Sequence, residues 1–144
     1  MKRLLPTSLS LLLLGAAPFT LAEEETDYHQ ITAVEGLQFE PVRVKIRPGR
    51  TARIAFTNED PNDQPHNIVI VKSGALEEIQ AASMAVNAAS QAKGFVHDSD
   101  HIIAASGLLT ADQSEEHVFE MPDEKGVYYY VCAFPGHAEL MYGA

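Results

Sequence analysis

The chain has 144 residues, of which 46% are hydrophobic, and it carries a formal net charge of −10. That length suits one domain with a packed core, and the acidic balance excludes nucleic-acid binding, which needs a basic surface. The sequence contains a single cysteine, so no intramolecular disulfide can form.

Residues 1–22 have the pattern of a secretory signal peptide. Lys2 and Arg3 give a positive start, an apolar stretch follows, and Ala22 leaves a small residue before a cluster of glutamates. The apolar stretch is short for a membrane span, although an uncleaved anchor is the alternative. We expect export to the periplasm and cleavage, which would make the mature chain two charges more negative and leave no membrane span. Residues 23–27 would then form a flexible acidic leader.

The sequence beyond this leader predicts a domain over residues 28–144 that begins with short strands. Alternating apolar and basic residues indicate a strand with one wet face at Val42–Ile46, and Pro48 and Gly49 form a turn. The continuous apolar run Ile68–Val71 is typical of a buried strand. The strands predicted in this part are 29–34, 42–46, 52–56 and 68–71.

The hydrophobic period changes in residues 75–92. This segment lacks proline and glycine and is rich in alanine, and Leu76, Ile79 and Val86 lie on one helical stripe. Gly94 is placed to end the helix. We therefore predict one inserted α-helix around residues 75–92, packed as an outer flap on a β protein.

Extended structure resumes after this helix. β-prone residues separated by turn signals predict further strands, and Asp123–Gly126 forms one of the turns. Many short strands with turns between them are typical of an antiparallel β-sandwich. The predicted fold class is therefore all-β with one inserted helix. The strands predicted in this part are 102–105, 108–109, 117–121 and 127–132.

Three residues with metal-binding side chains lie at the end of the last predicted strand. Cys132 is followed after four residues by His137 and after three more by Met141. Thiolate and thioether are soft ligands that suit Cu(I), and two histidines, one cysteine and a weak axial methionine form a blue electron-transfer copper site. His66 is the predicted second histidine, because it opens a buried strand that would lie beside the thiolate if paired with the cysteine strand.

Each of these residues also has a plainer interpretation when taken alone. Met141 could fill a gap in the core, Cys132 could be an inert buried thiol, and His66 could be a hydrogen-bonded loop histidine. Zinc is the main chemical alternative, but it prefers four strong tetrahedral ligands, and methionine is a poor one. The combination favours one copper ion held by His66, Cys132, His137 and Met141.

With these motifs the chain resembles the cupredoxins, the small blue copper proteins, over essentially all of residues 28–144. The cysteine loop is similar to that of azurins and auracyanins, and the segment Pro65–Asn67 is more similar to plastocyanins. The resemblance implies an eight-stranded Greek-key sandwich in which both histidines and the cysteine are trigonal ligands and the methionine is axial. It also implies that Asn67 hydrogen-bonds the cysteine loop.

The sequence departs from this family at several points, two of which bear on the site and on the last strand. Pro65 precedes the first histidine, where azurins usually have glycine, and the sequence ends at Ala144, where family members continue into a final strand. The sequence therefore leaves open whether the domain has that strand.

The expected function is to carry single electrons between redox proteins. The alternative is periplasmic copper storage or delivery with the same ligands, and a domain cut from a larger oxidase is a third possibility. We expect no enzyme activity and a monomer, with a cytochrome or an oxidoreductase as partner. The partner would approach an apolar collar around the ligand histidine. The acidic segment His97–His101 is expected to be a solvated loop. The collar residues are Phe134, Pro135, Ala138 and Leu140.

Overall fold

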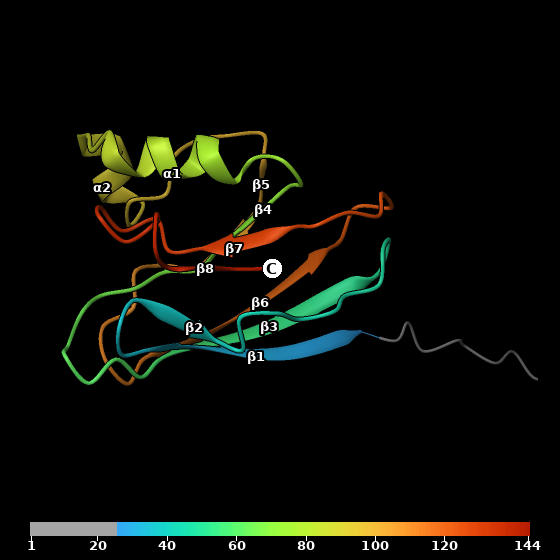
Figure 1. Ribbon diagram of the computed structural model, residues 1–144, viewed down its shortest axis with the longest axis horizontal. Coiled ribbons are helices and arrows are strands. Elements are labelled where there is room, and N and C mark those ends of the chain that lie inside the picture. Colours follow the sequence, from blue (N-terminus) through green and yellow to red (C-terminus); the bar gives the residue numbers. More distant parts are fainter. Residues whose placement is uncertain (1–25) are drawn as a thin grey trace, which may run out of the picture.

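The computed structural model describes residues 26–144, which form two four-stranded β-sheets packed as layers (Figure 1). The predicted signal peptide and residues 23–25 of the predicted leader lie outside the described residues. The predicted β-sandwich is confirmed. In sheet order, the first sheet contains β2 (Gln38–Glu40), β1 (Asp27–Val34), β3 (Thr51–Asn58) and β6 (Ser114–Glu120), and the second contains β5 (Ile102–Ala105), β4 (Val69–Val71), β7 (Tyr129–Val131) and β8 (Tyr142–Gly143).

The strands pair antiparallel except at one place. β1 and β3 run parallel, with His29 opposite Ile54 and Ile31 opposite Phe56. β2 pairs with the outer edge of β1, and the chain then crosses β1 to enter β3 on its other side. The first sheet is therefore mixed, whereas the second sheet is antiparallel throughout.

Aromatic side chains join the two sheets in the core. Phe39 meets Phe56 of its own sheet and Tyr130 of the other sheet edge to face, with ring centroids 6.0 Å and 5.4 Å apart. Every second residue of β3, including Ile54 and Phe56, is buried, as expected for a strand with one face on the core. Each fully buried side chain of this size contributes about 1.5–3 kcal/mol, so these contacts hold the second sheet firmly in place.

The predicted single helix over residues 75–92 is wrong in one respect, because two short helices stand there. They are α1 (Leu76–Met84) and α2 (Ala88–Ala92). Asn87 starts α2 with a capping box, since its side chain accepts from the Ser90 N–H and the Ser90 hydroxyl accepts from the Asn87 N–H. A residue that caps a new helix does not continue the previous one, and the surrounding alanines concealed this signal.

Both helices lie on the outside of the second sheet, as predicted for a flap (Figure 1). Ile79 of α1 is buried in a cluster with Val69, Val71 and Val131. Gly94, with φ of 64°, follows the end of α2 in the left-handed conformation that glycine adopts most easily. Within residues 26–144, neither helix is long and apolar enough to cross a membrane.

The predicted strand at residues 42–46 does not form. The segment is irregular, and its hydrogen bonds with the chain end run from the Val44 N–H to the Ala144 carbonyl and from the Ala144 N–H to the Val42 carbonyl, both 2.9 Å. Val44 packs on the core from one side. The apolar and basic alternation therefore reflects a segment with one packed face rather than a strand in a sheet.

The short strand β8 lies at the end of the sequence and pairs with β7. A Cβ atom on Gly143 would lie 2.3 Å from ring carbons of Tyr130, far inside normal contact distance. Glycine at this position therefore lets β8 lie directly against the Tyr130 ring.

Candidate metal centre

His66 stands where a polar loop enters the second sheet. Its backbone N–H and carbonyl both bond to Leu109, at 3.0 Å and 2.8 Å, just before β4 begins. Its side chain is fully buried. β4 pairs with β7 so that Val69 lies opposite Val131, the residue before Cys132. The predicted pairing of the histidine strand with the cysteine strand is therefore confirmed.

The loop after β7 folds back on itself and brings His137 to the same place. The His137 N–H bonds to the Phe134 carbonyl at 3.0 Å, and the Met141 N–H bonds to the His137 carbonyl at 2.8 Å. The Cys132 N–H then bonds to the Met141 carbonyl at 3.0 Å, which closes the loop. Backbone hydrogen bonds alone thus fix the positions of three of the four predicted ligands relative to one another.

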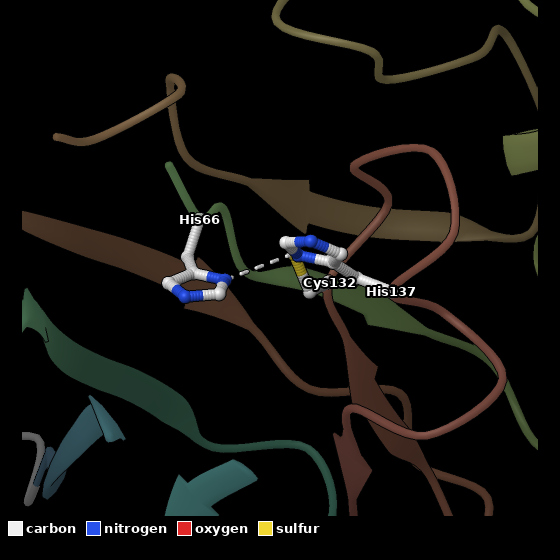
Figure 2. A group of neighbouring side chains, drawn as sticks. All are labelled: His66, Cys132 and His137. Carbon is white, nitrogen blue, oxygen red and sulfur yellow. Dashed lines mark hydrogen bonds between the residues drawn. The ribbon is translucent and has the colours of Figure 1, made fainter. Parts of the chain in front are cut away.

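Two imidazoles and one thiol converge in this buried place, and Figure 2 shows both rings beside the sulfur. Nδ1 of His66 and Nδ1 of His137 each lie 3.7 Å from Sγ of Cys132. All three ligand atoms lie within 4.8 Å of one another. The imidazole rings have their centroids 5.0 Å apart.

These spacings fit a small metal ion bound by all three atoms. With metal–sulfur and metal–nitrogen bonds of about 2.3 Å and 2.0 Å, as zinc has, a trigonal arrangement separates sulfur and nitrogen by about 3.7 Å. The donor set of one thiolate and two imidazoles suits copper. The residues present therefore fit a copper ion without rearrangement of the chain.

Met141 is fully buried and belongs to the same core cluster as Cys132. Its backbone is bonded to both other loop residues of the predicted set. The backbone of Met141 thus lies in the loop that carries Cys132 and His137, and its side chain is buried in the core cluster that includes Cys132.

Burial also sets the protonation of the ligand side chains. It raises the pKa of the Cys132 thiol to about 11, so a metal ion must displace the thiol proton to bind the thiolate. Burial, and next the charge of nearby His66, lower the pKa of His137. The His137 ring is consequently neutral at neutral pH, with a nitrogen lone pair for a metal.

Asn67 links the two halves of the centre, as the resemblance implied. Its Oδ1 accepts a hydrogen bond of 2.7 Å from the N–H of Ala133, the residue after Cys132. Its Nδ2 donates a hydrogen bond of 2.7 Å to the carbonyl of Gly94, beyond α2. The first contact was predicted, and the second ties the helical segment to the centre as well.

Other contacts near the centre gave no clear signal in the sequence. Asp60 Oδ2 lies 3.0 Å from Nε2 of His66, and both side chains are buried. Burial by itself would raise the pKa of Asp60, but hydrogen bonds from His66 and Asn62 outweigh it and lower that pKa. In the sequence, Asp60 stands in a run of turn-forming polar residues, and nothing distinguishes it from the exposed acidic residues around it.

The helical segment also touches the ligand loop directly. Gln80 Nε2 of α1 donates a hydrogen bond of 2.8 Å to the carbonyl of Ala138. The Phe95 ring packs edge to face on Phe134 with centroids 5.0 Å apart, and Phe134 in turn contacts the His137 ring at 4.7 Å. These contacts make the two helices part of the frame around the centre.

One residue of the predicted apolar collar is buried. Ala138 lies in the cluster that includes Ile79 of α1, so it cannot belong to an exposed collar. Leu140 is 69% exposed, Phe134 and Pro135 are half-buried, and the Phe134 ring contacts the His137 ring. The collar that remains as a prediction consists of Phe134, Pro135 and Leu140.

The acidic segment His97–His101 does not gather into a metal site. His101 forms an exposed pair with Glu78 at 2.7 Å, and the His97 ring lies 3.1 Å from the Ala85 carbonyl. Among residues 26–144, the one group of three or more potential metal-binding side chains close enough to share an ion is His66, Cys132 and His137.

Comparison with known proteins decides the family. Residues 27–144 match the model for copper binding proteins of the plastocyanin/azurin family. The chain belongs to this family. The predicted cupredoxin resemblance is therefore confirmed, and in this copper-binding family member His66, Cys132 and His137 are arranged so that they could share a metal ion.

Auracyanins are among the relatives that match this cupredoxin. Auracyanin-A of Chloroflexus aurantiacus is 34% identical over 109 residues, which cover 76% of this chain and 66% of the relative, just under two thirds of its length. The solved structure of auracyanin A, described as a "blue" copper protein, has a TM-score of 0.69 at 31% identity and covers 83% of this chain and 96% of that one. Reduced auracyanin from Roseiflexus castenholzii has a TM-score of 0.70 at 29% identity, covering 81% and 92%.

Proposed function

We propose that this protein is an exported blue copper protein that carries single electrons between redox proteins. The residues that would hold the copper ion are His66, Cys132, His137 and, more weakly, Met141. The observation that carries the proposal is the convergence of two imidazole nitrogens on one buried sulfur at 3.7 Å each. When bound, copper supplies a one-electron couple between Cu(I) and Cu(II).

The chain contributes a frame that holds the ligands still. His66 is fixed by its backbone bonds to Leu109, and the cysteine loop is closed by the bond between Cys132 and Met141. Asn67 joins these two segments. A site whose ligands are fixed by the fold needs little rearrangement when one electron enters or leaves, and fast electron transfer requires this.

The same ligand set argues against catalysis. Catalytic metal sites keep a position open for substrate or water. Here two imidazoles and one thiol converge, the predicted fourth ligand Met141 is buried as well, and the centre is closed to solvent except near His137, which is 8% exposed. A redox protein would therefore exchange electrons through the collar and the His137 ring, without any substrate reaching the metal.

The proposed export and the proposed type of partner are based on the signal-like segment and on the net charge. The signal-like segment 1–22 supports a periplasmic location. The acidic balance favours a partner with a basic face, such as a cytochrome or an oxidoreductase. The protein acts as a monomer whose collar is free for docking.

The test is the colour of the copper-loaded protein. The wild type should absorb strongly in the visible when oxidised, because a thiolate ligand on Cu(II) gives the blue site its colour. Cys132→Ser should lose this absorption, whereas His101→Gln, which changes an exposed histidine outside the cluster, should keep it. A blue Cys132→Ser variant would show that the ligands are misassigned, and a colourless copper-loaded wild type would refute the proposed function.

A further inference from the structure

Asp60 forms a buried contact behind the ligand His66, on the side of the ring away from the sulfur. Asp60 is 2% exposed and His66 is fully buried. Oδ2 of Asp60 lies 3.0 Å from Nε2 of His66. The Nδ1 atom on the other side of the same ring lies 3.7 Å from Sγ of Cys132. One imidazole therefore bridges a carboxylate and the candidate metal position.

Hydrogen-bond donors surround the Asp60 carboxylate. Oδ1 of Asp60 receives the backbone N–H and the side-chain amide of Asn62, at 2.8 Å and 3.1 Å. The Asp60 N–H itself bonds to Oδ1 of Asn58 at 3.1 Å. An ionised carboxylate has no proton to donate, so Nε2 of His66 is the donor in this contact, and Nδ1 faces the sulfur.

Among residues 26–144, the ion-pair partner of Asp60 is His66, and no ion pair joins Asp60 to a lysine or an arginine. A buried negative charge is costly unless a positive charge lies near it. A copper ion on the far side of the imidazole would provide that charge.

From this geometry we infer that Asp60 is a positioning residue for the copper site, and that its charge lowers the reduction potential. The inference rests on the proposed function. Through the His66 ring, a fixed negative charge stabilises Cu(II) more than Cu(I), because Cu(II) carries one more positive charge. The low dielectric around a buried pair preserves this difference. The hydrogen bond also sets the tautomer and the direction of the His66 ring.

The first test compares two neutralised carboxylates in the same loop. Asp60→Asn keeps the size of the side chain and removes its charge. Glu59→Gln removes one charge from the exposed neighbouring side chain and is the matched control. Voltammetry should show a higher potential for Asp60→Asn, with the ratio of reduced to oxidised protein at a fixed applied potential rising about tenfold, or ~59 mV for one electron. Glu59→Gln should stay close to the wild type.

Three results would overturn the inference. These are an unchanged potential in Asp60→Asn, a lowered one, or an equal rise in both variants, which would indicate a general charge effect. A merely structural role would lower the melting temperature of Asp60→Asn and leave its potential unmoved. If the wild type binds no copper or stays colourless, it is the proposed function that fails.

The second test needs no variant and stands even if Asp60→Asn does not fold. In the reduced, copper-loaded wild type, proton NMR should show the Nε2–H of His66 shifted downfield and exchanging slowly with water, because a buried carboxylate accepts it. Rapid exchange of that proton would contradict the contact on which the inference rests.

Discussion

At the scale of single residues, Met141 has the most ambiguous role of the four predicted ligands. It is fully buried in the core cluster that also contains Cys132, so its side chain stabilises the fold whatever it does to copper. A buried methionine can be exchanged for leucine at a cost usually below about 1.5 kcal/mol, because the two side chains have similar volumes. This substitution therefore separates the packing role from the ligand role.

Met141→Leu should keep the blue colour and raise the reduction potential. A weak axial thioether stabilises Cu(II) more than an alkyl group can, and the axial ligand tunes the potential of such sites. A tenfold shift in the balance between the oxidation states would appear as about 59 mV in voltammetry.

Met121→Leu makes the same exchange at the end of β6, where Met121 is also buried. It should leave the potential unchanged while costing a similar amount of stability. A lowered potential in Met141→Leu, or loss of its copper, would exclude Met141 as the axial ligand.

The ligands could be predicted from residue type, from spacing and, for His66, from its place before a buried strand, whereas Asp60 could not. The spacing of Cys132, His137 and Met141 identified the ligand loop, because one loop supplies all three. Asn67 adjoins a predicted ligand and was implied by the family resemblance. Asp60 was not predicted, because its role depends on burial beside the ring of His66, six residues away. The sequence does not show whether an aspartate is buried or exposed.

At the scale of elements, the helical segment is connected to the copper-ligand loop at two points and to Asn67 at a third. α1 reaches the loop through Gln80, and Phe95, which follows α2, packs on Phe134 of the loop. The Gly94 carbonyl, just beyond α2, accepts the hydrogen bond from Asn67. Phe95 has φ of 70°, which is uncommon for a residue with a side chain. This backbone conformation accompanies the placement of its ring on Phe134. The helical segment thus supports the ligand loop as well as covering the sheet.

Removing one of these connections should loosen the loop. Gln80→Ala leaves the Ala138 carbonyl without its side-chain donor, and a lost hydrogen bond of this kind costs about 0.5–1.5 kcal/mol. We expect the melting temperature of the copper-loaded protein to fall by about 2–8 °C. Copper should also pass faster from the reduced variant to a Cu(I) chelator, as measured by the chelator's absorption.

The control for this change is Gln91→Ala, on the exposed side of α2. Both variants place alanine in a helix, so any gain in helix propensity is shared. Equal melting and equal copper release in the two variants would show that the contact between α1 and the loop contributes nothing.

The two helices also show what hydrophobic periodicity does not predict. Alanine density and an apolar stripe predicted helical structure and its outer position correctly. They did not reveal the break, because Asn87 and Ser90 cap α2 through side chains, whereas Val86 of the predicted stripe is 41% exposed. Capping is a local hydrogen-bond effect that hydrophobic periodicity does not register.

At the scale of the whole molecule, the sandwich brings together residues that lie far apart in the sequence. The buried run at β4 and the β-prone run at β7 were both predicted as strands, so their pairing could be expected. The parallel pairing of β1 and β3 and the irregular segment 42–46 could not, because both depend on how the chain crosses β1 between β2 and β3. The short strand β8 packs under Tyr130, and two residues carry too little pattern for prediction.

The net negative charge and the apolar collar should affect different steps of electron transfer. The charge affects association with the partner, and the collar affects the contact through which the electron passes. The net charge of −10 should attract a basic redox protein over long range, so transfer to a basic soluble cytochrome should slow between about 0.01 M and 0.15 M salt, where the Debye length falls from about 30 Å to about 8 Å. Leu140→Glu should slow transfer further at every salt concentration. It would bury an unpaired charge at the contact, at a cost of about 1–3 kcal/mol. Stopped-flow absorption of the cytochrome measures both effects.

Val118→Glu is the control that separates the effect of the added charge from the effect of changing the docking surface. Val118 is 56% exposed on β6 of the other sheet, and the substitution adds the same charge there. It should follow the salt dependence of the wild type without the added loss. Equal rates in the two glutamate variants would show that partners do not dock at the collar.

Repeated cycles of reduction and reoxidation distinguish an electron carrier from a copper store. A frame that holds its ligands still should retain copper through these cycles. If reduced copper instead leaves readily for a competing copper chaperone, and Leu140→Glu leaves transfer unchanged, delivery of copper becomes the better account of this fold.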